Sequence, residues 1–320
     1  MAQDSRGGAL SVQMLEYGAG GSRVAVVSET EAIANAIERY LREGAYEVDH
    51  PAWPGNFLDR ARRGRDDLLA ALGAEVRRRG VDREHAPVPR DLDLVSWTRR
   101  KVTPMVEGLF PAAEREAVLS LLERSVVFLT AGNIEEVLLG QMWLHTAWAL
   151  ANLYLSSVGA ALLGPGAPSL LGLSAETTCY VSADYFAEQQ RRFDDYVIHE
   201  AAHVFHNWKR RNTGLRETRT REWLLDIEFR KRETFAYSCE AYGWIVEHAR
   251  TRRERIAMGQ EYAAVVTRFR DEDLDAEELA SIVGEACESR NGWKVILRRC
   301  AAAKKMTRRE TLALLTQGAR

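Results

Sequence analysis

The chain has few cysteines, and they are far apart. The 320 residues contain four, at positions 179, 239, 287 and 300, and no two of them form a C-x-x-C pair. This spacing excludes a cysteine zinc site and argues against a disulfide framework. It favours free, buried thiols in a reducing compartment, so we expect a cytoplasmic protein.

The sequence also lacks a secretion signal and a strong net charge. Its first residues contain no basic segment followed by an apolar run, so we expect no signal peptide. The formal net charge of -2 gives no general reason to expect a nucleic-acid or membrane partner. Hydrophobic residues make up 46% of a chain long enough to bury a large core, in one lobe or two.

Charged residues are absent from residues 137–175. The apolar run at the start of this segment is long enough to span a bilayer. However, polar residues such as Gln141, His145 and Asn152 are scattered through it, and no basic cluster lies close to either end. We therefore predict one buried central helix and no membrane segment, with His145 as a histidine of the core.

Proline is absent after Pro168, which permits long helices in the second half of the chain. Asp194 or Asp195 favours the start of a helix that runs to about Arg211, and Gly214 is a plausible stop. Further helices are predicted over residues 224–252, 275–289, 292–304 and 307–316.

Helix signals also occur in the first half. A capping box from Ser28 to Glu31 predicts a helix that ends near Glu43. Residues 57–79 and 114–129 predict two amphipathic helices, with a looser connection over residues 87–111 that holds one short helical stretch. The apolar residues expected to face inward from the first of these helices are Leu58, Leu68, Leu69, Leu72 and Val76.

Strand signals are few. The β-prone run T-T-C-Y-V-S over residues 177–182 is the best strand candidate in the second half. Residues 10–17 and 23–27 could form a hairpin around a glycine-rich turn, which lacks a complete phosphate-loop motif.

Residues 199–203 read H-E-A-A-H in an apolar, helical context. On a helix, His199 and His203 lie one turn apart on the same face, so both imidazoles can reach one metal ion. Glu200 is offset from that face and can address a water on the metal. A zinc ion lowers the pKa of such a water to about 7, and a neighbouring carboxylate can take its proton and pass it to a leaving group.

The site needs a third protein ligand, because the two histidines alone leave it incomplete. His206 lies one turn beyond His203, too far along a straight helix to reach the same ion. It is either a neighbour of the ligands in the cleft or a histidine at the helix end that the helix dipole favours. Glu233, Tyr237 and Glu240 share one helix face. The acidic candidates downstream are Glu217, Glu222, Glu228, Glu233 and Glu240.

Over residues 177–242 the chain resembles the zincin metallopeptidases, and within them the gluzincin branch, whose third ligand is a glutamate on a later helix. The metzincin pattern does not fit, because His206 and Lys209 stand where it requires Gly and His. E-T-F-A at residues 233–236 matches the E-x-x-A form of that later helix, which implies Glu233 as the third ligand. Glu240 is the alternative, as a ligand or as an acid that orients a histidine, and Glu222 has a thermolysin-type spacing.

The resemblance implies a mainly α (α+β) fold with a zincin-like helical core and a small sheet. Its edge strand, for which residues 177–182 are the candidate, would pair with the substrate backbone. We predict an N-terminal, mainly helical region over residues 1–130 and a metal-binding catalytic region over residues 131–320, which could form one continuous domain. The candidates for stabilising an oxyanion are Tyr180, Tyr237, Tyr242 and His248.

The expected function is that of a zinc-dependent peptidase, with a peptide or protein substrate and Glu200 as general base. One alternative is a zinc hydrolase that acts on another amide, in a modified peptide or a small molecule. A second is a binding or regulatory module, because residues 209–232, from Lys209 to Arg232, are rich in basic residues that could bind nucleic acid. Interleaved acids favour an ion-pair network in this stretch instead. The sequence does not predict the oligomeric state.

Overall fold

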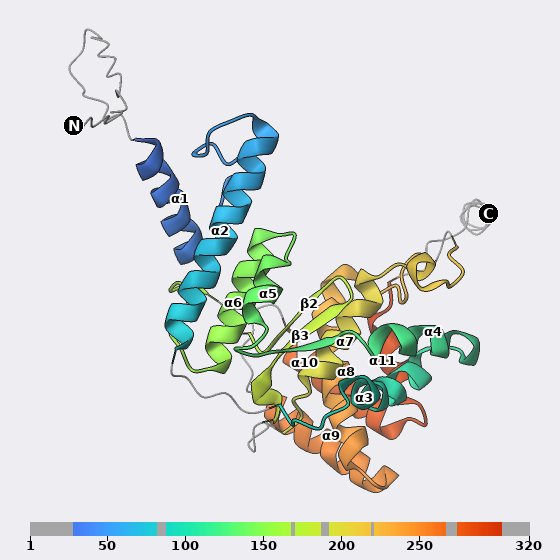
Figure 1. Ribbon diagram of the computed structural model, residues 1–320. Coiled ribbons are helices and arrows are strands. Elements are labelled where there is room, and N and C mark those ends of the chain that lie inside the picture. The colour runs from blue at the N-terminus through green and yellow to red at the C-terminus, as the bar shows by residue number, and fades with distance from the viewer. Residues whose placement is uncertain are drawn as a thin grey trace, which may run out of the picture.

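The computed structural model describes residues 28–81, 88–167, 170–186, 192–218, 221–266 and 274–302. These residues form helices α1 to α11, three short 3-10 helices and a three-stranded sheet, so the fold is mainly helical as predicted (Figure 1). The predicted hairpin over residues 10–27 and the predicted helix over residues 307–316 lie outside the described residues.

The first helix begins where its capping residue predicts. Ser28 accepts a hydrogen bond from the Glu31 amide at the start of α1 (Glu29–Glu43), and Gly44, with a φ of 68°, ends it. Helix α2 (Phe57–Gly80) buries the predicted apolar residues except Leu58, which is 73% exposed. The prediction for Leu58 is wrong. The first two turns of α2 contain no buried residue, so no other described element covers the N-terminal end of this helix.

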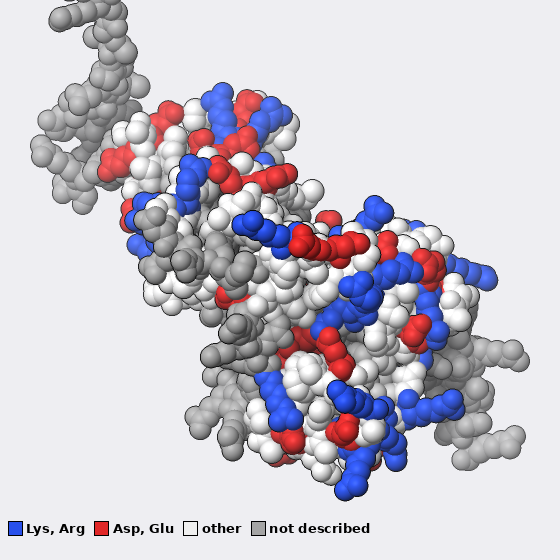
Figure 2. Space-filling view, turned by 60° about the horizontal axis from the view of Figure 1, so that its bottom comes forward, with Lys and Arg blue, Asp and Glu red and all other residues white. Residues whose placement is uncertain are grey.

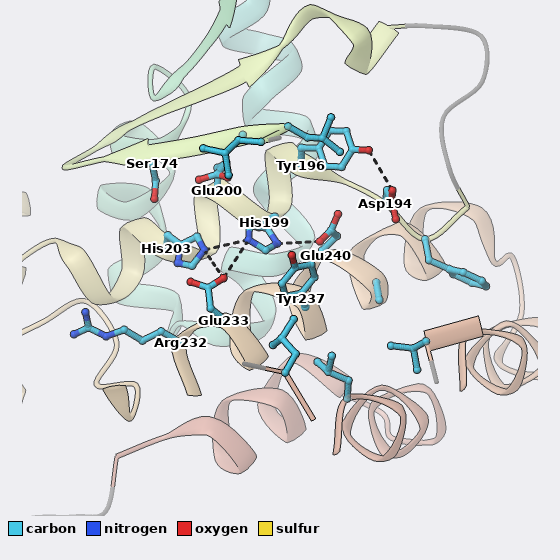
Figure 3. A pocket seen from close by; sticks show the side chains of 18 of the residues that line it. Ser174, Asp194, Tyr196, His199, Glu200, His203, Arg232, Glu233, Tyr237 and Glu240 are labelled. Carbon is cyan, nitrogen blue, oxygen red and sulfur yellow. Dashed lines mark hydrogen bonds and ion pairs between the residues drawn. The ribbon is translucent and has the colours of Figure 1, made fainter. Parts of the chain in front are cut away.

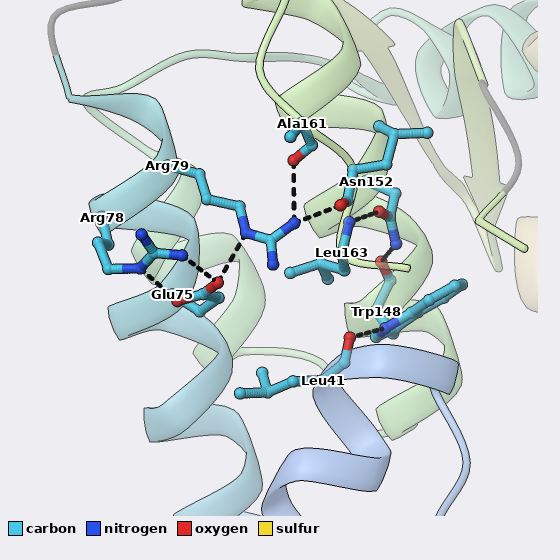
Figure 4. Close-up of polar contacts among 9 residues, drawn as sticks. Leu41, Glu75, Arg78, Arg79, Trp148, Asn152, Ala161 and Leu163 are labelled. Carbon is cyan, nitrogen blue, oxygen red and sulfur yellow. Dashed lines mark hydrogen bonds and ion pairs between the residues drawn. The ribbon is translucent and has the colours of Figure 1, made fainter. Parts of the chain in front are cut away.

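Polar contacts join α2 to the segment that follows α6 (Figure 4). Arg79 binds Glu75 on its own helix, with 2.7 Å between Nε and Oε1, and donates to the carbonyls of Ala161 and Leu162. The Asn152 side chain accepts from the Leu163 amide at 2.8 Å. These bonds satisfy the backbone of an irregular segment that carries no regular secondary structure of its own.

The segment without charged residues forms two helices, not the single helix predicted. Helix α5 (Ile134–Leu139) ends at Gly140, and α6 (Leu144–Ser157) begins after a break. The Gln141 side chain lies in this break and bonds the Val137 carbonyl and the Tyr180 hydroxyl. His145 is exposed in the first turn of α6, so its prediction as a core residue is wrong. No described helix is both long and apolar enough to cross a membrane.

The sheet has the order β1-β3-β2. Strand β3 (Thr178–Ser182) is central, parallel to β1 (Val126–Leu129) and antiparallel to β2 (Gly172–Ala175). The strand predicted over residues 177–182 is therefore present, but its prediction as the edge strand is wrong. The edge strand towards the cleft is β2, which the sequence signal missed because glycine and serine have low strand propensity.

Several predicted boundaries also shift. The helix predicted over residues 114–129 is α4 (Ala112–Leu122), and the residues after it form β1. The predicted loose connection contains α3 (Leu94–Leu109), which is continuous in spite of Pro104. The helix predicted over residues 224–252 is shorter, as α8 (Arg232–His248). It is followed by α9 (Arg252–Val266), which was not predicted, then α10 (Ala276–Glu288) and α11 (Gly292–Cys300).

The sheet lies between two hydrophobic clusters. The larger cluster joins α3, α4, α7 (Tyr196–Asn207), α8, α10 and α11. The smaller one joins α1, α2, α5 and α6, which form the elongated part at one end of the molecule in Figure 1. Phe128 belongs to the larger cluster and its neighbour Leu129 to the smaller one, because successive side chains of a strand point to opposite faces.

A buried ion pair fixes the connection between α7 and α8 to the rest of the large cluster. Arg210 is 1% exposed and lies in the 3-10 helix η2 (Arg210–Thr213). Its Nη2 is 2.6 Å from Glu114 Oε1 on α4, and its Nε donates to the Arg216 carbonyl at 2.9 Å. On the face shown in Figure 2, Lys and Arg side chains lie beside Asp and Glu side chains.

Replacing Arg210 by alanine leaves Glu114 desolvated without its main partner. We expect the free energy of unfolding to fall by about 3 kcal/mol, measured by denaturant titration. The matched control is Arg211→Ala, whose side chain is 63% exposed and 3.8 Å from Glu217, and which should change stability by less than about 0.5 kcal/mol. Equal effects of the two substitutions would contradict a structural role for the Arg210 pair.

Candidate metal centre

Helix α7 carries the H-E-x-x-H motif on the side that lines a cavity. Asp195 caps the helix, since its Oδ1 accepts from the Ile198 amide at 3.2 Å. The helix ends at Asn207, four residues before the predicted end at Arg211, because the chain becomes extended at Trp208. Gly214, with a φ of 72°, ends the short 3-10 helix that follows instead. The apolar residues that anchor α7 in the core are Val197, Ile198, Ala201, Ala202, Val204 and Phe205.

The nitrogen atoms of the two histidines and a carboxylate oxygen of Glu233 converge on one point (Figure 3). The Nε2 atoms of His199 and His203 are 3.1 Å apart. Glu233 Oε2 lies 3.8 Å from the first and 3.6 Å from the second. Ligand atoms at zinc bond lengths in a tetrahedron are about 3.3 Å apart, so these three atoms could hold a metal ion.

This donor set matches the ligands expected from the sequence. Two imidazoles and one carboxylate are ligands that a divalent metal ion such as zinc accepts. Glu222 lies elsewhere, paired with Lys209 at 2.7 Å, and Glu217 lies near Arg211. Glu240 is not a member of the converging group either.

Glu240 binds the far side of His199 instead. Its Oε2 is 2.9 Å from His199 Nδ1, and its Oε1 accepts from the Asp195 amide at 2.8 Å. Burial alone would lower the pKa of His199, but the carboxylates of Glu240, Glu200 and Glu233 together raise that pKa to about 9. A carboxylate on Nδ1 fixes the proton there and directs Nε2 towards the metal position.

Asp195 extends this arrangement to α3. Its Oδ2 lies 2.7 Å from Lys101 Nζ, and the Tyr185 hydroxyl donates to its Oδ1 at 3.3 Å. Burial raises the pKa of Asp195 to about 6, and Lys101 opposes the rise. The sequence pointed to Asp194 or Asp195 only as an acid that favours the start of a helix. It contained no signal for Lys101, which is 94 residues away.

His206 contacts the second histidine ligand. Its Nε2 lies 3.2 Å from His203 Nδ1, and the residue is 3% exposed. Burial, with the nearby His203 and Arg232, lowers the pKa of His206 to about 3, so this ring is neutral. A neutral His206 can accept the Nδ1 proton of His203, which leaves His203 Nε2 free for a metal. Of the two interpretations from the sequence, this placement favours a neighbour of the ligands.

Glu200 lies under strand β2. The residue is 6% exposed, and a Cβ atom added to Gly172 would come within 2.5 Å of Glu200 Oε1. Burial raises the pKa of Glu200, while His199 and His203 lower it. A carboxyl group with a raised pKa is suited to accept and then return a proton near neutral pH. Gly172 is therefore a close contact of this site that the sequence analysis did not identify.

The centre opens into a cavity of about 1130 Å³. Strand β2, α7 and α8 border it near the ligands, and apolar residues of α9 and α10, such as Tyr262, Val265 and Leu279, line its other part. Among the candidates for an oxyanion contact, only Tyr237 lines this cavity, with its ring 4.5 Å from that of His199. Tyr180, Tyr242 and His248 are placed elsewhere: they contact Gln141, Trp293 and Trp244.

The basic stretch between α7 and α8 is largely neutralised by acids. Five of its side chains form ion pairs, which supports the predicted ion-pair network: Lys209 with Glu222, Arg210 and Arg221 with Glu114, Arg211 with Glu217, and Lys231 with Glu278. Trp223 packs under Lys209, whose Nζ is 5.3 Å from the ring centre.

Comparison of the chain with protein-family models, with curated proteins and with solved structures finds no match.

Substitutions of single carboxylates should distinguish a metal ligand from a residue that orients a ligand. We expect the wild-type chain to bind one metal ion and Glu233→Ala to lose it. Glu240→Gln should keep the ion but bind it about 10- to 100-fold more weakly. Elemental analysis and competition with a chromogenic chelator measure these outcomes. Glu217→Ala, an acid in the connection between the ligand helices, is the control and should bind as the wild type does; full metal retention by Glu233→Ala would overturn the assignment.

Proposed function

We propose that the protein is a zinc-dependent metallohydrolase, and specifically a peptidase of the gluzincin type. The observation that carries this proposal is the convergence of His199, His203 and Glu233 beside the buried carboxyl group of Glu200. The H-E-x-x-H motif supplies three of these residues, and a separate helix supplies the fourth. The buried, free cysteines support a reducing, cytoplasmic location.

The chemistry divides between the metal and Glu200. When bound, zinc lowers the pKa of its water to about 7 and polarises a carbonyl oxygen. Glu200 accepts a proton from the attacking water and donates it to the departing nitrogen. Glu240 and His206 hold the two imidazoles with Nε2 directed at the metal position, and burial of Glu200 raises its pKa towards the range that this shuttle needs.

The edge strand supports a peptide as the substrate. Within the described residues, β2 is hydrogen-bonded to β3 on one side only, and residues 170–174 line the cavity next to Glu200. An extended peptide can add to such an edge through backbone hydrogen bonds. A small amide substrate, the alternative, would not require this strand.

Replacing the proposed base should abolish turnover without disturbing the metal. We expect Glu200→Gln to lower the rate of peptide cleavage by about 100-fold or more and to keep one zinc per chain. Mass spectrometry of a digested peptide mixture measures the cleavage rate, and elemental analysis measures the zinc content. Unchanged cleavage by Glu200→Gln would refute the proposed role. Absence of cleavage by the zinc-loaded wild type, combined with turnover of a small amide, would favour the alternative.

Gly172 offers an independent test of the position of Glu200. In Gly172→Ala the new methyl group would displace the Glu200 carboxyl group, and a displacement of about 1 Å costs about 100-fold in rate. Metal binding should be unchanged. The control is Gly166→Ala, where an added Cβ meets nothing within 4 Å and activity should persist. Equal activity of both variants would argue that Glu200 does not act from its observed position.

A further inference from the structure

Arg232 is a cation in the cleft without an acidic partner among the described residues. It lines the cavity together with Arg230, and it directly precedes the ligand Glu233. Its Nε is buried and makes no hydrogen bond within the part of the chain that the structure describes. Most basic neighbours in the stretch from Lys209 to Lys231 are, by contrast, paired with acids. Arg232 therefore differs from these neighbours in both its position and its pairing.

The position of this charge in its helix is unfavourable. Arg232 is the first residue of α8, where the helix dipole disfavours a cation. The adjacent Lys231 also lies at this helix end, but it has Glu278 as its partner. A charge at an unfavourable helix position, with no acidic partner among the described residues, is expected mainly at functional sites.

The guanidinium is held at the cleft by an aromatic ring. The Cζ atom of Arg232 lies 5.2 Å from the centre of the Phe229 ring, a cation–π distance. Figure 3 shows Arg232 on the His203 side of the centre, next to Glu233. Phe229 and Arg230 line the same cavity, so this end of the cleft presents an aromatic face and two positive charges.

We propose that Arg232, with Arg230 at the rim, binds a carboxylate of the substrate beside the metal centre. The planar guanidinium matches a carboxylate in a two-point hydrogen-bonded pair. The identity of this anion as part of a substrate rests on the proposed hydrolase function, whereas the anion site itself rests only on Arg232 and its surroundings. The preferred substrates are then peptides with a carboxylate near the cleaved bond, from an acidic side chain or from a free C-terminus.

Matched metal-binding probes test the site without any turnover. The probes are the monohydroxamates of succinic, glutaric and adipic acid, each compared with its uncharged carboxamide counterpart. The hydroxamate binds the zinc, and the three chain lengths place the carboxylate or carboxamide at three distances from the metal. We expect at least one acid to bind the zinc-loaded wild type about tenfold more tightly than its amide. In Arg232→Gln this preference should disappear, while the affinity for the amide stays the same.

Arg216→Gln is the matched control, because Arg216 is exposed in the same basic stretch and does not line the cavity. It should keep the preference for the acid. Arg232→Gln should fold normally, since it removes a cation from a helix N-terminus; thermal unfolding checks this. Equal binding of acid and amide at all three lengths by the wild type would overturn the proposal while leaving the metal site intact. Loss of binding of all probes would instead contradict the zinc centre.

Peptides then distinguish the two sources of the carboxylate. The zinc-loaded wild type is given peptide pairs that differ only in Glu against Gln beside each cleavable bond, or only in a free against an amidated C-terminus. A preference of about tenfold for one member of a pair, lost in Arg232→Gln but kept in Arg216→Gln, identifies the source. Cleavage of all peptides at equal rates would show that Arg232 does not select the substrate, although the peptidase proposal would stand.

Discussion

The geometry of the candidate centre depends on one buried contact, between the start of α7 and the middle of α8. Asp195 caps α7 with its side chain and donates its backbone amide to Glu240, which in turn holds His199. Lys101 of α3 balances the charge of Asp195 from behind. Asp195 therefore ties the start of the helix that carries the histidines to the helix that carries Glu233, in addition to the apolar packing between these two helices.

The sheet supplies the other side of the cleft. It separates two hydrophobic clusters, and its edge strand β2 comes so close to Glu200 that only glycine fits at position 172 without a shift. The proposed base is thus enclosed by backbone, which explains why it is buried although it belongs to a helix that borders an open cavity. Arg232 lies on the side of His203 and Glu233 (Figure 3). The hydrogen-bonding edge and the unpaired cation are therefore separate features of the same cleft.

Local signals in the sequence were sufficient where the determining contacts are local. The caps at Ser28 and Asp195 form hydrogen bonds within three residues, and the one-turn spacing of His199 and His203 follows from helix geometry. The choice of Glu233 came from a resemblance of the E-x-x-A type, and the structure brings this residue to the two histidines. The set of three candidate ligands, His199, His203 and Glu233, was therefore largely predictable from two short motifs.

What the sequence by itself determined is the set of helices with strong caps and the chemical identity of the candidate ligands. Only the tertiary structure decided that β3 is central and β2 is the edge, that the apolar run breaks at Gln141, and that Glu240 orients His199 rather than joining it at the metal. The physical reason is that these outcomes depend on partners distant in the chain. The order of the strands depends on hydrogen bonds between segments that are far apart in the sequence. The role of the Glu240 carboxylate depends on which nitrogen of His199 the packing of α7 against α8 places beside it.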